Sequence, residues 1–176
     1  MTRSDRLVLL GSYLESGHRI ATRLAASVEG LGPSFPLDAG SVSHLTAAEE
    51  ERIDAFLHRF SSLAASVQDH IGRALLMAEE EDLSEMSRKD QRLLLEKLGA
   101  LDPRWAFGFI AELMNKLVHT YPDDPAKQAE VLNQVYQRST DLLSCFDRMT
   151  LYASHKFGVA RGLPPVSRAP PHQPRS

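Results

Sequence analysis

The chain has 176 residues, a formal net charge of −3 and one cysteine, and 43% of its residues are hydrophobic. Its length allows a single domain with a substantial core. The net charge excludes a chain-wide basic field of the kind that attracts nucleic acid, but it is compatible with a local basic groove. The lone Cys145 excludes an internal disulfide, and an N-terminus unlike a signal peptide adds to the expectation of a cytoplasmic protein. No apolar run approaches the roughly 20 residues that cross a bilayer, so we expect no membrane association.

The first predicted helix covers residues 4–29, with Ser4 as its N-cap and Asp5 in its first turn. Its apolar stripe has heptad-like spacing and consists of Leu7, Leu10, Leu14, Gly17, Ala21, Leu24 and Val28. Glycines and prolines end this helix, and residues 32–44 are predicted to form a long connection.

The second predicted helix covers residues 47–80. Thr46 is the expected N-cap, and Glu49, three residues later, completes a capping box. The apolar stripe consists of Ile53, Phe56, Leu57, Phe60, Leu63, Ala64, Val67, Ile71, Ala74, Leu75 and Ala78. The acidic residues 79–82 are interpreted as a solvated helix end or turn.

The third predicted helix covers residues 87–98. Ser87 and Asp90 have capping-box spacing, and Gly99 is expected just past the helix end, where glycine is favoured. The apolar face is supplied by leucines, namely Leu93, Leu94, Leu95 and Leu98.

A fourth predicted helix covers residues 101–121 and has a distinct start and end. Asp102 is its expected N-cap, Pro103 suits the first turn, and Pro122 ends it. Its apolar stripe alternates three- and four-residue steps and consists of Phe107, Ile110, Met114, Leu117 and Tyr121.

The fifth predicted helix runs from Pro125, with Asp124 as N-cap, to about residue 155. Its stripe consists of Val131, Leu132, Val135, Leu142, Phe146 and Met149. Proline-rich residues 158–176 are predicted to form a disordered tail. Amphipathic helices without any strand pattern predict an all-α fold, an up-down helical bundle of about five helices over residues 1–157.

A second face of the fourth helix carries Glu112, Asn115 and His119, three and four residues apart. A histidine near a helix C-terminus, where the helix dipole favours its protonated form, can act as an acid or a base near neutral pH. The neighbouring Asn115 and Tyr121 can donate hydrogen bonds to a phosphate. A structural histidine that caps the last turn is the alternative interpretation of His119.

Other chemistry-bearing residues favour structural interpretations. Cys145 lies near the apolar stripe of the fifth helix, which is typical of a buried residue rather than a nucleophile. Arg19 and Arg23 lie one turn apart and are interpreted as a surface pair. The remaining histidines are scattered, and no phosphate-binding glycine loop or paired-cysteine motif is present, so we expect no metal and no cofactor.

Residues 115–125 (NKLVHTYPDDP) strongly resemble the signature of HEPN-domain proteins, and most closely the HepT-like toxins that are paired with a minimal nucleotidyltransferase antitoxin. The family hallmark is Arg, usually followed by Asn, then three residues and His, often with Tyr two further on. Residues 53–67, residues 93–102 and Trp105 at the start of the motif helix match the flanking pattern. The resemblance covers about residues 46–149.

The resemblance implies a metal-independent endoribonuclease that acts as a homodimer, with two motif helices forming a composite cleft for an RNA substrate. It assigns catalysis to His119 and a polar supporting role to Asn115. In the HepT-like group, the motif tyrosine, here Tyr121, receives nucleotide from the antitoxin (AMPylation), and the added negative charge would repel RNA.

One position departs from the family pattern, because Met114 stands where the family has its arginine. Methionine carries no charge and cannot bind a phosphate oxygen. Three explanations remain open: a weakened or inactive relative, an arginine supplied from elsewhere, such as the partner chain, or an inactive variant of natural or deliberate origin. Two further interpretations stand beside the nuclease, namely a non-catalytic binding subunit for a nucleotidyltransferase and a plain helical adaptor.

Overall fold

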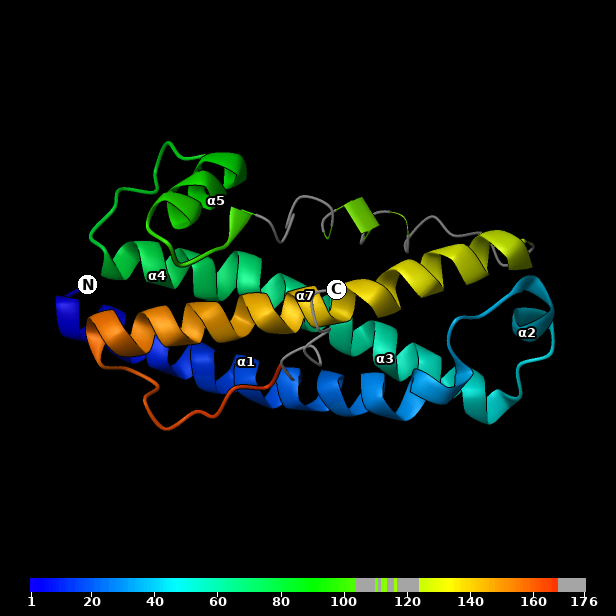
Figure 1. The fold of residues 1–176 in the computed structure, drawn as a ribbon. Coiled ribbons are helices and arrows are strands. Elements are labelled where there is room, and N and C mark those ends of the chain that lie inside the picture. The colour runs from blue at the N-terminus through cyan, green and yellow to red at the C-terminus, as the bar shows by residue number, and fades with distance from the viewer. Residues whose placement is uncertain (104–109, 111, 114–115, 117–123, 168–176) are drawn as a thin grey trace, which may run out of the picture.

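Helices make up the regular structure of the described residues, which are 1–103, 110, 112–113, 116 and 124–167 of the computed structural model. Figure 1 shows three long helical stretches lying side by side along the bundle. They are α1 (Arg3–Leu31), α7 (Pro125–Phe157) and the stretch of residues 47–78, which we call the rod. α1 runs antiparallel to α7 and to this rod. The predicted all-α bundle is confirmed for the described residues. None of their helices is both long and apolar enough to span a bilayer.

The first helix begins one residue earlier than predicted, because Thr2 rather than Ser4 is its N-cap. The Thr2 hydroxyl accepts a hydrogen bond from the Asp5 backbone N–H at 3.2 Å, and the Asp5 carboxylate accepts one from the Thr2 N–H at 2.8 Å. This capping box satisfies amide groups that have no partner within the helix. Most of the predicted stripe is buried, namely Leu10, Leu14, Gly17, Ala21 and Leu24.

The connection predicted over residues 32–44 contains two short helical elements, so it is not wholly irregular. The 3₁₀ turn η1 (Gly32–Ser34) directly follows α1, and α2 (Ala39–Ser43) lies against α7. The carboxylate of Asp38 caps α2 by accepting a hydrogen bond from the Ser41 N–H at 2.7 Å. Figure 1 shows α2 at the end of the bundle that lies away from the N-terminus.

Two side chains of α7 fasten this connection to the bundle. The amide of Asn133 accepts from the N–H of Leu37 and donates to its carbonyl, both at 2.8 Å. The ring of Tyr136 stacks on Phe35 with a centroid distance of 4.3 Å, and its hydroxyl donates to the carbonyl of Val28 at 3.2 Å. The two hydrogen bonds of Asn133 pair backbone groups of Leu37 that the irregular path of the loop would otherwise leave without partners.

The second predicted helix is a continuous helical rod with a change of geometry in its middle. It consists of α3 (Ala47–Ala65), the π-helical turn η2 (Ser66–Ile71) and α4 (Gly72–Ala78). The predicted capping box of Thr46 and Glu49 is confirmed at its start. In a π turn the backbone hydrogen bonds join residues i and i+5, so the side chains that follow are rotated relative to those of an uninterrupted α-helix. Such turns are frequent at functional sites.

The acidic stretch after α4 is only partly solvated, which corrects the sequence interpretation. The side chain of Glu79 is 10% exposed, and its carboxylate accepts hydrogen bonds from the Tyr152 hydroxyl and, at 2.6 Å, from the Lys156 ammonium. Glu80 has a positive φ of 66° and lies 3.7 Å from the Arg6 guanidinium. Ion pairing therefore joins the end of α4 to both α1 and α7.

α5 (Arg88–Lys97) lies over α4 near the N-terminal end of the bundle (Figure 1). The predicted capping box of Ser87 and Asp90 is confirmed, and Gly99 has the expected left-handed conformation with a φ of 79°. The predicted leucine face is wrong at Leu93, which is 46% exposed. Four leucines in six residues cannot all lie on one face at 100° per residue.

α7 is the longest helix of the described chain, and its start agrees with the sequence prediction. The Asp124 carboxylate accepts from the Lys127 N–H at 3.0 Å, and Pro125 occupies the first position. The helix continues to Phe157 and ends at Gly158 with a φ of 74°. Every residue of its predicted stripe is buried, namely Val131, Leu132, Val135, Leu142, Phe146 and Met149.

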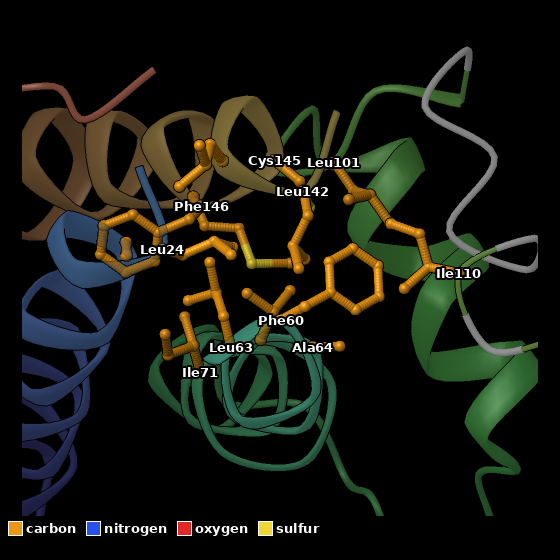
Figure 2. Packing of buried hydrophobic residues seen from close by; sticks show 14 of the residues in the cluster. Leu24, Phe60, Leu63, Ala64, Ile71, Leu101, Ile110, Leu142, Cys145 and Phe146 are labelled. Atoms are coloured by element: carbon orange, nitrogen blue, oxygen red, sulfur yellow. The ribbon is translucent and has the colours of Figure 1, made fainter. Parts of the chain in front are cut away.

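The core lies between the long helices and continues towards the segment that carries the predicted motif. Figure 2 shows Leu142 and Phe146 of α7 facing Phe60 and Leu63 of α3. Leu101 and Ile110 lie on the same side of this cluster and are 2% exposed each.

The first ten residues of the predicted tail have no helix or strand, as the composition indicates, but they contact the bundle. The Asp147 carboxylate accepts from the backbone N–H groups of Val166 and Ser167 at 2.9 and 2.7 Å. The His18 ring lies within hydrogen-bonding distance, 3.0 Å, of the Pro164 carbonyl. Residues 158–167 therefore run along α1 and α7.

Candidate functional site

The residues predicted to form the catalytic and modification site lie outside the described residues; they are Met114, Asn115, His119 and Tyr121. Their neighbours in the sequence are described in part. Ile110, Glu112, Leu113 and Lys116 are helical, in agreement with the predicted fourth helix.

The burial of these four neighbours gives the helix an inner and an outer face. Ile110 and Leu113 are 2% and 0% exposed, whereas Glu112 and Lys116 are exposed. The predicted stripe contains Ile110 but omits Leu113, which belongs to the same buried face three residues on. Glu112 was predicted on the polar face, and its exposure confirms that assignment.

A buried acidic residue fixes the start of the same segment. Asp102 is 6% exposed, and its carboxylate lies 3.7 Å from the guanidinium of Arg148 on α7. Arg148 also donates from Nε to the carbonyl of Gly99 at 2.9 Å. Pro103 lies in a 3₁₀ turn directly after Asp102. Arg148 therefore fastens the beginning of the predicted motif helix to the longest helix of the bundle.

A positively charged cleft opens between α5 and the rod at η2 and α4; we call it the α5 cleft. It has a volume of about 490 Å³. The charged side chains that line it are Arg73, Arg88, Lys89, Arg92 and Asp69. Four cations against one carboxylate give the lining a positive charge, although the whole chain has a net charge of −3. The α5 cleft is thus a local basic groove, which the net charge of the whole chain did not exclude.

Hydrogen bonds and ion pairs arrange the polar wall of the α5 cleft. Arg88 lies 3.1 Å from Asp69 of η2, and Arg73 of α4 donates to the amide oxygen of Gln91 at 3.5 Å. Gln91 is 7% exposed, and its amide nitrogen donates to the carbonyl of Met86 at 3.1 Å. These contacts hold α5 at a fixed distance from the rod.

 Apolar side chains form the other part of the lining, the apolar floor of the cleft, which consists of Val67, Leu95, Leu101 and Met149. Leu101 belongs to the segment that leads into the predicted motif helix, and Met149 follows directly after Arg148. The α5 cleft therefore combines a cationic wall with an apolar floor, a lining typical of small-molecule sites.

The α5 cleft is not among the sites predicted from the sequence. Arg88 and Arg92 are four residues apart on one helix, and this spacing signals a shared face. Arg73 comes from a different helix, so no local pattern connects it to α5. Arg19 and Arg23 were predicted to be a surface pair. Both are exposed on α1, which agrees with that interpretation.

Cys145 is buried, as the sequence predicted, and this excludes it as a nucleophile in the folded protein. Its side chain is part of the core, and burial raises the pKa of the thiol to about 12. A thiol with that pKa holds almost no thiolate near neutral pH. Within the described part of the chain, no three His, Cys, Asp or Glu side chains come together in a way that could hold a metal ion.

Comparisons of the chain with protein-family models, with curated proteins and with solved structures found no match. The fold therefore defines an all-α helical bundle, and the resemblance to HEPN-domain proteins stays a prediction from the sequence motif.

Proposed function

We propose that the chain is a HepT-like HEPN protein, a toxin-type endoribonuclease by descent, that is controlled by a minimal nucleotidyltransferase. The observation that carries the proposal is the motif of Asn115, His119 and Tyr121, followed by PDDP and a long terminal helix, within an all-α chain. In this proposal the protein is cytoplasmic and acts as a homodimer through its motif helix.

The burial pattern of the described residues supports this proposal. His119 follows Lys116 by three residues and Glu112 by seven, a spacing that corresponds to one helix face. Glu112 and Lys116 are exposed, whereas Ile110 and Leu113 are buried on the opposite side. A catalytic histidine on the face of Glu112 and Lys116 would be accessible to RNA, which a core histidine would not be.

The proposed reaction needs no metal. A ribose 2′-hydroxyl attacks the adjacent phosphorus, the bond to the 5′-oxygen breaks, and a cyclic phosphate and a free 5′-hydroxyl result. His119 exchanges protons with the attacking or the leaving oxygen, and Asn115 donates a hydrogen bond to the phosphate. Transfer of a nucleotidyl group from a nucleoside triphosphate to the Tyr121 oxygen would release pyrophosphate and the hydroxyl proton. It would add negative charge to the motif and repel RNA.

Restoring the family arginine tests the nuclease proposal. We expect expression of Met114→Arg without the nucleotidyltransferase to slow growth and degrade cellular RNA, because the guanidinium supplies the missing charge at the phosphate. Met114→Arg combined with His119→Ala is the matched control and should be harmless. Intact RNA and normal growth with a folded, dimeric Met114→Arg protein would refute the nuclease proposal.

A non-catalytic binding subunit is the second candidate function, and the observation that favours it is Met114 itself. Under this alternative the bundle binds a nucleotidyltransferase, and the missing arginine has no consequence. Copurification with that partner, without RNase activity in the wild type or in Met114→Arg, would support it. Intact-mass measurement after coexpression checks for nucleotide on Tyr121, with Tyr121→Phe as the control.

A further inference from the structure

A second cavity lies where the connection between α1 and α3 folds over the end of one helix and the start of the other; we call it the α2 pocket. Its lining comes from α1, η1, α2, α3 and the loop residues between them. Figure 1 shows α2 at the end of the bundle where α7 begins. The pocket has a volume of about 330 Å³, at the lower end of the range of ligand sites, which suits a small molecule.

One part of the α2 pocket is aliphatic and consists of Leu31, Leu37, Leu45 and Ile53. Leu31 is 4% exposed, and Leu37 and Ile53 are 6% exposed each. The two hydrogen bonds from Asn133 to the backbone of Leu37 hold this wall in place before any ligand arrives. An aliphatic group of a ligand would leave water on contact with this wall, which is a favourable transfer, and the fixed wall loses little entropy.

Two side chains of opposite charge, Glu49 and Arg52, line the same pocket and lie three residues apart on α3, a spacing that places them on one helix face. Oε2 of Glu49 accepts from the backbone N–H of Thr46 at 2.8 Å and from its hydroxyl at 2.7 Å. Nη2 of Arg52 donates to the carbonyl of Gly30 at 2.6 Å. These bonds position both groups and use one carboxylate oxygen and one guanidinium nitrogen, so each group keeps capacity for a ligand.

His44 adds a hydrogen-bond acceptor to the lining. Its Nδ1 lies 2.8 Å from the carbonyl of Gly40. A carbonyl oxygen only accepts, so Nδ1 is the donor, and in the neutral imidazole Nε2 is therefore the acceptor. Glu49 and His44 can thus accept hydrogen bonds from a cationic group, whereas Arg52 can donate to an anionic one. The pocket combines acceptors, donors and an aliphatic wall.

We propose that the α2 pocket binds a free α-amino acid with an aliphatic side chain. Glu49 and His44 bind its ammonium group, Arg52 binds its carboxylate, and its side chain packs against the leucine and isoleucine wall. A zwitterion matches a carboxylate beside a guanidinium better than a simple anion or cation, because each pocket charge then has an opposite charge to face. None of these residues belongs to the predicted motif, so a failure of the nuclease proposal leaves this inference standing, and the reverse also holds.

Calorimetric titration of the full chain with L-leucine tests the proposal, and three probes each lack one part of the ligand. Isocaproate lacks the ammonium group, isoamylamine lacks the carboxylate, and glycine lacks the aliphatic side chain. We expect each of them to bind about tenfold or more weakly than L-leucine, because each leaves one part of the lining unused. No binding of L-leucine, or equal affinity for L-leucine and any one of the three probes, would overturn the assignment.

Two substitutions should separate the two charged contacts. Glu49→Gln should weaken the binding of L-leucine and isoamylamine about tenfold or more and leave isocaproate unchanged or tighter. Arg52→Gln should weaken L-leucine and isocaproate by a similar factor and leave isoamylamine unchanged or tighter. The controls are Glu50→Gln and Arg19→Gln, which change the net charge in the same way at exposed positions outside the pocket and should have no effect.

Glu49 and Arg52 also make contacts that stabilise helix ends, so circular dichroism must show that each variant is folded before it is titrated. The crossed pattern guards against a loss of structure, because each variant is expected to keep its affinity for one probe. Equal weakening of isocaproate and isoamylamine by a folded variant, or equal effects of Arg52→Gln and Arg19→Gln, would refute the site.

Discussion

The guanidinium of Arg148 lies 3.7 Å from the carboxylate of Asp102, and this contact joins α7 to the first residues of the predicted motif helix. Asp102 is 6% exposed, so its charge has lost most of its hydration. A buried carboxylate needs partners that replace this hydration. Arg148 supplies one of them, and its hydrogen bond to the Gly99 carbonyl also orients the turn between α5 and Asp102.

Removal of this contact should destabilise the protein. We expect Arg148→Gln to lower the free energy of unfolding by about 1–2 kcal/mol, less than for a fully buried pair because Arg148 keeps contact with solvent. Urea denaturation measures the effect. Arg138→Gln on the same helix removes a surface pair with Asp141 and should cost less than about 0.5 kcal/mol. Equal losses in the two variants would contradict a special role of Arg148.

Two glycines of α1 should respond oppositely to substitution by alanine. A Cβ at Gly17 would lie 2.8 Å from the Phe146 ring and 2.9 Å from Cδ1 of Ile71, so Gly17→Ala should destabilise the bundle by about 1–3 kcal/mol. A Cβ at Gly11 meets no atom within 4 Å, so Gly11→Ala should stabilise the helix by about 0.5–1 kcal/mol. Thermal unfolding of both variants checks the prediction, and a change of the same sign in both would refute it.

The pKa of Cys145 predicts both its reactivity and a dependence of stability on alkaline pH. A thiol reagent at pH 8 should modify the unfolded chain and leave the native protein unmodified, because burial raises the pKa of the thiol to about 12. The native state keeps its proton when the unfolded state loses it, so this contribution to stability is present below pH 9 and declines as the pH rises from about 9 towards 12. The decline should be smaller in Cys145→Ala, which lacks the thiol. Rapid labelling of the native protein would contradict the buried position.

The capping box at the start of α3 predicts a loss of stability in acid. Hydrogen bonds from the Thr46 backbone and hydroxyl lower the pKa of Glu49 below its usual value of 4.5. Its contribution to stability is therefore present above pH 4.5 and is lost as the pH falls through the lowered pKa. Glu49→Gln should be less stable than the wild type near pH 7, and this difference should shrink as the pH falls below 4. Denaturant titrations at both pH values measure it, and Glu50→Gln is the control, because Glu50 takes no part in the capping box.

Local sequence signals predicted much of the helical framework. The starts of α3, α5 and α7 agree with the capping residues Thr46, Ser87 and Asp124, because a cap depends on side chains within three or four residues of the helix end. The first N-cap was wrong by two residues, since Thr2 and Ser4 offer the same hydroxyl. The candidate site came from a motif instead, and its residues lie outside the described part of the chain.

What the sequence by itself determined is therefore the helical class, most helix starts and the buried stripes, since these follow from capping chemistry and from the 3.6-residue period. Only the tertiary structure placed the π turn at η2 and brought Arg73 to the same cleft as Arg88 and Arg92. It also paired Arg148 with Asp102, 46 residues away in the numbering. Such contacts depend on how each helix is rotated and packed against its neighbours, and no local spacing encodes that rotation.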